Sequence, residues 1–298
     1  MKQFELEERF KNQAHLALPT KSKFPSCDKY ESWKLLKILS GSIAYKHYKS
    51  SKYIKQTKNF LRPNFASFDG KWHVGLANFL SEDMSFEEIF TKYETSGRLE
   101  NAYYKSLNTE LLNFLRFQKI GHHTTAFIYL YRMLEHSAYA APMLFILSEK
   151  TFIKSYGEIS KWFTSDKQKS ELAFFKKFVE SVFDDETMQT DLEFKLLAET
   201  EDIRKKHYKT IKQRSGGKSY DFIDVAENEN FSIPFSQVSS FIITIRNRFV
   251  HFGITNSGNI TSNEIMDSDD FFASLNDTLM HWLATLFANL AQKSILAQ

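Results

Sequence analysis

Residues 241–253 read FIITIRNRFVHFG, and from this stretch we predict how the C-terminal part of the chain folds. On a helix with 100° between residues, the apolar side chains in and just before it fall within about 50° of one direction. They are Val238, Phe241, Ile242, Ile245, Phe249 and Phe252. Asn247 and His251 lie about 200° and about 240° from Ile245, on the opposite face. The stretch therefore predicts an amphipathic helix that begins near Pro234 and keeps Asn247 and His251 out of the core.

Arg246, Asn247 and His251 provide the groups that cleavage of RNA without a metal requires. RNA carries its own nucleophile, the 2′-hydroxyl, so the protein must move protons near neutral pH and stabilise charge on the phosphate. A histidine titrates in that range, and an arginine makes two parallel hydrogen bonds to phosphate oxygens while it stays charged. Asn247 would position a phosphate or the imidazole. We expect these three residues to be catalytic.

Arg246 and His251 do not meet on a straight helix, because they lie about 140° apart around its axis. They would converge if the helix loosens at Gly253, or if a second chain supplies half of the site. The small polar residues Ser240 and Thr244 would let a second copy of the helix come close. A histidine near a helix C-terminus also complements the helix dipole, and this structural role is the simplest alternative.

The string IRNRFVHFG at residues 245–253 resembles the signature of the HEPN superfamily, the higher eukaryotes and prokaryotes nucleotide-binding domain. That signature is an Arg, usually followed by Asn, Asp or His, and then a His after four to six residues. Arg246, Asn247 and His251 match it in this order, with four residues between Arg246 and His251. Some branches carry a nucleotidylated Tyr two residues after the histidine. This chain has Gly253 there, which argues against that branch.

The resemblance implies an activity and a set of partners. HEPN sites of this kind are metal-independent ribonuclease sites that form where two domains pair, so we expect RNA as substrate, a homodimer and no cofactor. Many such proteins are toxins or abortive-infection effectors in prokaryotic defence against phages. An antitoxin or a defence-system partner protein is therefore among the expected partners.

The composition is that of a helical protein of a reducing compartment. The 298 residues are 42% hydrophobic, and ten glycines and five prolines leave few turns. The single cysteine, Cys27, excludes an intrachain disulfide. The first residues are charged, and the longest uncharged apolar run, residues 137–148, is too short to span a bilayer. We expect a cytoplasmic protein that does not enter the membrane.

The pattern along the chain predicts an all-α fold with two regions. Residues 1–100 are of mixed, mostly helical character and uncertain fold, and we expect them to be an accessory region. Residues 101–298 are expected to form a HEPN-like helical bundle. The expected helices cover residues 28–53, 107–120, 124–141, 142–156, 165–183, 189–214, 234–253 and 269–296, and residues 218–232 read as a polar loop.

Glu135 is the residue that we expect to orient Arg246 from a neighbouring helix. Arg132, Glu135 and His136 have the spacing of neighbours on one helix face, so a local ion pair explains them equally well. No set of His, Cys or carboxylate residues has a recurring ligand spacing, and we expect no metal site.

Two basic segments are candidates for binding an RNA backbone. The first segment interleaves lysines with tyrosines: Lys46, Lys49, Lys52, Lys55 and Lys58 with Tyr45, Tyr48 and Tyr53. The second is the preferred RNA-binding segment and contains Lys205, Lys206, Lys209, Lys212 and Arg214. The alternative is that these cations only solvate helix faces, since 39 Lys and Arg face 36 Asp and Glu.

The sequence thus favours a metal-independent endoribonuclease of the HEPN type. The main alternative is a non-catalytic HEPN module that binds RNA, a nucleotide or a protein partner. A helical scaffold is the third hypothesis, and the exposed positions expected for Asn247 and His251 argue against it.

Overall fold

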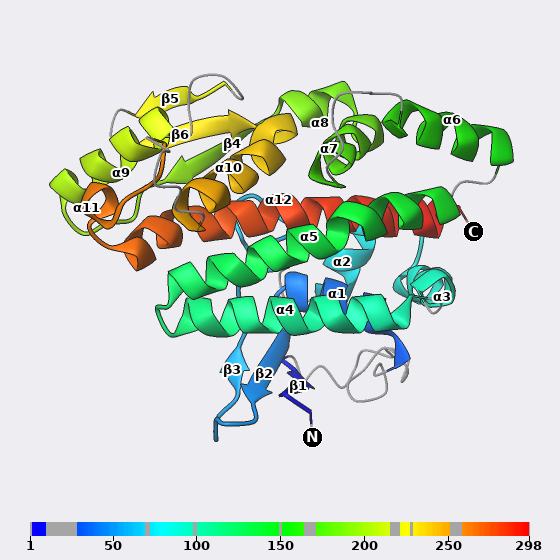
Figure 1. The fold of residues 1–298 in the computed structure, drawn as a ribbon. Helices are drawn as coiled ribbons and strands as arrows, with labels where there is room; N and C mark the ends of the chain where they lie inside the picture. Colours follow the sequence, from blue (N-terminus) through cyan, green and yellow to red (C-terminus); the bar gives the residue numbers. More distant parts are fainter. Residues whose placement is uncertain are drawn as a thin grey trace. The chain divides into compact units, whose positions relative to one another are not determined.

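The computed structural model describes residues 2–9, 29–68, 72–97, 100–148, 151–163, 171–214, 221–226, 229–250 and 258–297. These residues form twelve α-helices and two three-stranded antiparallel sheets (Figure 1). The protein is therefore mostly helical, as predicted. The two small sheets correct the expectation of an all-α fold.

The chain divides into two compact units, each made of separate segments. Unit 1 consists of Met1–Leu115, Met143–Lys150 and Leu283–Gln298, and unit 2 of Arg116–Pro142 and Thr151–Trp282. Helices that contribute residues to both units are α4 (Asn101–Lys119), α5 (His123–Ser148) and α12 (Ser268–Leu296). From the sequence we place a boundary at residue 100, where the composition of the chain changes. This boundary stays a prediction.

Unit 1 contains the first sheet and the N-terminal helices. Its other elements are β1 (Phe4–Glu8), α1 (Glu31–Leu39), β2 (Ile43–His47), β3 (Ile54–Lys55), α2 (Trp72–Leu80) and α3 (Phe86–Gly97). The sheet has the order β1-β2-β3, and Phe4 lies opposite His47. Helix α1 packs on α3 through Trp33, which is fully buried with its ring centroid 5.2 Å from that of Phe90.

The helix expected over residues 28–53 is wrong beyond Leu39. Gly41 has a φ of +71°, and a Cβ at this position would lie 2.8 Å from the carbonyl oxygen of Lys58. Glycine alone adopts such a conformation without strain and leaves room for the approaching backbone. The chain therefore turns at Gly41 and continues as the hairpin of β2 and β3.

Unit 2 contains the second sheet and the helix that carries the HEPN-like motif. Its other elements are α6 (Phe152–Phe163), α7 (Glu171–Val182), α8 (Asp185–Gln189), β4 (Asp191–Lys195), α9 (Glu201–Arg214), β5 (Ile223–Ala226), β6 (Asn230–Pro234), α10 (Val238–Val250) and α11 (Ser262–Ile265). The sheet has the order β4-β6-β5, and α10 packs against it (Figure 1). Phe241 of α10 lies 5.5 Å from Phe194 of β4 and 6.1 Å from Phe231 of β6, measured between ring centroids.

The single helix expected over residues 189–214 is wrong, because β4 occupies its first part. Leu192 and Phe194 are buried, while the residues that alternate with them are exposed, which is the two-residue period of a strand. The polar loop expected over residues 218–232 contains β5 and the start of β6. Strand β6 pairs with both of its neighbours, so its backbone groups are satisfied within the sheet.

Pro142 lies inside α5 and not at the start of a helix, which corrects the division expected between residues 141 and 142. A proline removes one backbone hydrogen bond from a helix. Ala138 and Ala141, directly before it, are almost completely buried. We attribute the continuation of α5 to this buried face, whose packing offsets the lost hydrogen bond.

Candidate functional site

Helix α10 holds its predicted apolar face in the core of unit 2. Four of the six residues of that face have no exposed surface, namely Val238, Phe241, Ile242 and Ile245. Phe249 is half-buried and contacts Phe272 of α12 with ring centroids 4.9 Å apart. Phe252 lies outside the described residues. The apolar face therefore sets the orientation of α10, and Asn247 on the opposite face is exposed.

Arg246 lies against an aromatic ring of α5. Its guanidinium carbon is 4.8 Å from the ring centroid of Tyr131, a residue that is only 5% exposed. The Nη1 atom of Arg246 donates a hydrogen bond to Oδ1 of Asn247 at 2.9 Å. A guanidinium is attracted to the face of an aromatic ring, and its planar fork is held in one orientation by such a contact. Two motif residues and Tyr131 thus form one cluster.

Glu135 belongs to the same cluster through Tyr131. It lies one helical turn after Tyr131 on α5 and is hydrogen-bonded to the tyrosine hydroxyl. Burial raises the pKa of Tyr131, and Glu135 raises it further, which together outweigh the opposite effect of Arg246. Tyr131 is therefore a neutral donor at physiological pH, and its ring keeps the electron-rich face that attracts Arg246. The expected orienting role of Glu135 stays a prediction.

Sequence reasoning missed Tyr131, which provides the ring under Arg246. Arg132, which the sequence places beside Glu135 on one helix face, contacts a different ring: its guanidinium carbon is 5.8 Å from the ring centroid of Tyr129. A tyrosine one turn before a glutamate on an amphipathic helix carries no signal of its own. Only the fold brings it to Arg246.

His251 lies outside the described residues, and so does Gly253. Helix α10 is described as far as Val250, and the description resumes at Gly258. The catalytic role of His251 therefore stays a prediction from the sequence, and the site that the structure places consists of Arg246, Asn247, Tyr131 and Glu135.

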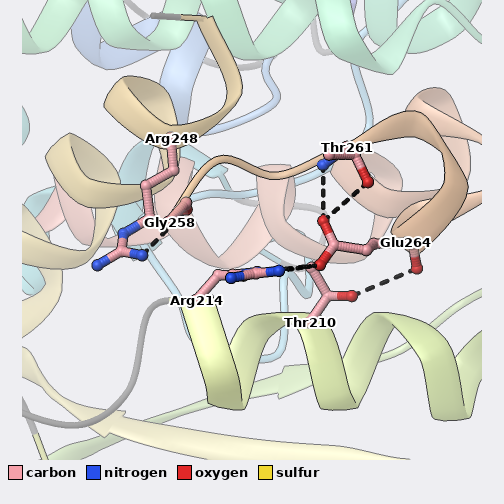
Figure 2. A network of polar contacts seen from close by, with 6 residues as sticks. All are labelled: Thr210, Arg214, Arg248, Gly258, Thr261 and Glu264. Atoms are coloured by element: carbon pink, nitrogen blue, oxygen red, sulfur yellow. Dashed lines mark hydrogen bonds and ion pairs between the residues drawn. The ribbon is translucent and has the colours of Figure 1, made fainter. Parts of the chain in front are cut away.

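Arg248, the second arginine of the motif, has a structural contact (Figure 2). Its Nη1 donates to the carbonyl oxygen of Gly258 at 3.0 Å, and its own carbonyl accepts from the backbone N–H of Ile260 at 2.8 Å. These bonds join the end of α10 to residues 258–260. The two arginines of the Arg-Asn-Arg sequence are thus distinguished by their contacts, which makes Arg248 a natural control for Arg246.

Arg214, one of the residues expected to bind RNA, is bound instead to Glu264 (Figure 2). Its Nε and Nη2 atoms donate to the carboxylate at 3.0 Å and 2.5 Å, and the backbone and hydroxyl of Thr261 donate to the same carboxylate. Burial acts to raise the pKa of Glu264, but the hydrogen bonds from Arg214 and Thr261 outweigh it, and the pKa is lowered. The pair links α9 to α11.

The other basic residues of α9 differ in whether a carboxylate pairs with them. Lys205 contacts Glu201 at 2.6 Å, and Lys212 contacts Asp224 at 2.8 Å. Lys206 is exposed with its Nζ 3.2 Å from the sulfur of Met266. Lys209 is exposed, and no acidic side chain in the described part of the chain pairs with it. The positive charge that this segment offers to a phosphate is therefore smaller than its sequence indicates, and RNA binding by α9 stays a prediction.

Comparisons with protein-family models, curated proteins and solved structures found no match to this chain. Among the described helices, none has the combination of length and apolar character that crossing a bilayer requires. Within the same residues, no three or more His, Cys, Asp or Glu side chains gather in a group that could hold a metal ion.

Proposed function

We propose that the protein is a metal-independent endoribonuclease of the HEPN type, with Arg246, Asn247 and His251 as catalytic residues. The observation that carries the proposal is the position of Arg246: half-buried, with its guanidinium over the ring of Tyr131 and hydrogen-bonded to the exposed Asn247. A guanidinium held in this way has its fork oriented before substrate arrives, as stabilisation of a charged phosphate in the transition state requires.

The proposed reaction is an internal transfer at phosphorus. The 2′-hydroxyl of RNA attacks the adjacent phosphate and loses its proton, the bond to the 5′-oxygen breaks, and that oxygen takes up a proton. His251 would move these protons, and Arg246 would stabilise the charge on the phosphate oxygens. The products are a 2′,3′-cyclic phosphate and a free 5′-hydroxyl. As proposed from the resemblance, the biological role is that of a toxin or an antiviral defence effector in a prokaryote.

We further propose that a second copy of the chain completes the site. On α5, Ile128 and Tyr139 expose 36% and 52% of their surfaces and lie within about 40° of Glu135 around the helix axis. Large apolar side chains on a face next to the Arg246 cluster are suited to contact with another chain. A two-fold contact there would bring together two sets of motif residues.

The test of the activity is incubation of purified protein with total RNA in excess EDTA. We expect cleavage that yields 2′,3′-cyclic phosphate or 3′-phosphate ends, and no cleavage of DNA, which lacks the 2′-hydroxyl. Cleavage that requires a divalent metal, or that extends to DNA, would refute the mechanism. RNA that is bound and left intact would support the non-catalytic HEPN module instead.

The test of the shared site is a mixture of an Arg246→Ala chain with a His251→Ala chain after subunit exchange. Each homodimer lacks one catalytic group in both half-sites, whereas a heterodimer contains one half-site with both groups. Partial recovery of cleavage in the mixture is the expected result. A monomeric protein that cleaves RNA would show that both residues act within one chain.

A further inference from the structure

Unit 1 presents a second set of cations at the end of the β2–β3 hairpin, on a part of the chain that the proposed ribonuclease site does not use. In Figure 1 this hairpin points away from helix α1. We define the hairpin tip as Tyr48, Lys49, Lys52, Tyr53 and Lys55. Tyr48 is 50% exposed, Tyr53 is 39% exposed, and the three lysines are exposed.

The two tyrosines of the hairpin tip are held in place from behind. The ring of Tyr48 lies against that of His47, with centroids 4.5 Å apart, and His47 is itself packed on Phe4. The hydroxyl of Tyr53 donates to Oε2 of Glu5 at 3.1 Å. Lys46 lies over the ring of Tyr53, with its Nζ 5.1 Å from the centroid. Aromatic rings that are held in place and remain partly exposed lose little entropy when a planar group stacks on them.

The turn between the tyrosines is ordered by short-range hydrogen bonds. The backbone N–H of Ser50 donates to the carbonyl of His47 at 2.7 Å, and the Ser50 hydroxyl donates to the carbonyl of Lys52 at 3.1 Å. These bonds therefore fix the backbone positions of Lys49 and Lys52. Lys49 lies over the ring of Tyr48, with its Nζ 5.6 Å from the centroid.

The lysines of the hairpin tip keep their charge available, unlike those of α9. Glu5 lies opposite Lys46 in the sheet, and its pKa is lowered by hydrogen bonds from Lys46 and Tyr53. Lys46 binds Glu5 with its Nζ at 2.7 Å. Among the residues that the structure describes, no carboxylate pairs with Lys49, Lys52 or Lys55. The tip thus combines exposed rings with positive charge that no ion pair neutralises.

We propose that the hairpin tip is a binding surface for single-stranded nucleic acid. Bases stack on Tyr48 and Tyr53, and Lys49, Lys52 and Lys55 contact the phosphates. Alternation of aromatic rings and cations fits a single strand, because every base offers a flat face and every nucleotide a phosphate. An anionic membrane is the less favoured partner, since the residues between the tyrosines are Ser50, Ser51 and lysines and provide no aliphatic group for insertion.

The test measures binding of oligouridine and oligodeoxythymidine, each of about fifteen nucleotides, by fluorescence anisotropy over a range of salt concentrations. All chains carry Arg246→Ala, so that binding is measured whether or not the protein is a nuclease. Replacing Lys49, Lys52 and Lys55 together by Gln is expected to reduce the slope of log K against log salt by about 2, at about 0.7 per phosphate contact on a single strand. Tyr48→Ala should weaken binding about tenfold with the slope unchanged, and Tyr48→Phe should restore it.

The control replaces Lys105 and Lys119, two exposed lysines of α4 that belong to neither basic segment, by Gln. It changes the net charge by a similar amount and is expected to leave the slope nearly unchanged. The proposal is overturned if the triple variant keeps the slope of the parent chain or if the control reduces it equally. It is also overturned if the triple substitution abolishes binding to vesicles that contain phosphatidylserine and leaves oligonucleotide binding intact. Circular dichroism of each variant confirms that the fold is retained.

Discussion

Helices α9 and α10 both place cations on the surface of unit 2, but the partners of these cations differ. On α9, three cations are bound to carboxylates: Lys205 to Glu201, Lys212 to Asp224 and Arg214 to Glu264. On α10, Arg246 lies on the ring of Tyr131, and Arg248 donates to the carbonyl of Gly258. The three partners on α9 are carboxylates, whereas the ring of Tyr131 and the carbonyl of Gly258 carry no net charge.

This difference indicates that the number of basic residues in a segment is a poor measure of its capacity to bind phosphate. A cation in an ion pair must give up its carboxylate before it can bind a phosphate, and this exchange brings little net free energy. A cation held by a ring or a carbonyl is positioned without being neutralised. We therefore expect substitution of Arg246 to affect RNA cleavage and substitution of the paired cations of α9 to affect stability.

The largest effect on RNA cleavage is expected for substitution of His251. His251→Ala should reduce RNA cleavage by a factor of about 100 to 10,000, the usual range for loss of a general acid–base group. The melting temperature should hardly change, because residue 251 falls on the side of the predicted wheel opposite the apolar face. Single-turnover cleavage of a labelled RNA and thermal unfolding measure the two quantities. A variant that unfolds, or that cleaves at the rate of the parent, would contradict the role.

A smaller effect is expected from the ring under Arg246. Tyr131→Leu should lower kcat about fivefold with little change in KM, because a cation–π contact contributes about 1 kcal/mol and holds the fork for the transition state. Tyr131→Phe keeps the ring and should retain most of the activity, although it loses the hydrogen bond to Glu135. A phenylalanine variant as impaired as the leucine variant would assign the role to the hydroxyl, and hence to Glu135.

On α9 the expected effect is on stability. Since the pKa of Glu264 is lowered in the folded protein, its contribution is present above the unfolded value of about 4.3 and is lost as the pH falls through the folded value. Glu264→Gln should therefore reduce the free energy of unfolding by about 1 kcal/mol at pH 7, because the pair with Arg214 is partly exposed. Urea unfolding at neutral pH and near pH 3 measures the difference, which should be smaller at the lower pH. A difference that is equal at both would show that the ion pair is not its source.

The smallest effects are expected for the exposed ion pairs of α9. Lys205→Gln and Lys212→Gln should each change stability by less than about 1 kcal/mol and leave RNA cleavage at the level of the parent. Lys209, which has no ion pair in the described part of the chain, is the position on α9 where a loss of RNA affinity is expected. If the paired lysines prove as important for RNA binding as Lys209, the contrast between α9 and α10 does not hold.

The part of the fold that sequence periodicity predicts well is α10. The positions of Val238, Phe241, Ile242 and Ile245 follow from a period of 3.6, and all four are fully buried. The exposure of Asn247 follows from the same period. A helix that packs with one face is specified by its own residues, and no knowledge of its partner is required.

Strand β4 shows a signal that the sequence contains and that the expected helix obscured. In DLEFK, residues 191–195, apolar and charged residues alternate strictly, which is a strand pattern. The basic helix α9 that follows has a helical period of its own, and the expected helix carried this period backward over the five residues of the strand. Strands of five residues next to strong helices are easily lost in this way.

The remaining features depend on contacts between distant segments. Tyr131 and Arg246 lie on different helices, and Arg214 and Glu264 belong to α9 and α11, so neither pair has a local sequence pattern. The turn at Gly41 is likewise required by the backbone of Lys58, which approaches from a later segment. Such contacts are consequences of the tertiary fold, and a single sequence does not specify them.

The most direct measurement is the rate of RNA cleavage in EDTA for the parent chain and for three variants, Arg246→Lys, Arg248→Lys and Arg214→Lys. Each variant keeps its positive charge and loses the arginine fork, so the three differ only in the contacts of the replaced residue. The account predicts a loss of about 100-fold for Arg246→Lys and rates close to the parent for Arg248→Lys and Arg214→Lys. Equal rates for all four proteins would contradict the claim that the Arg246 cluster is the catalytic site.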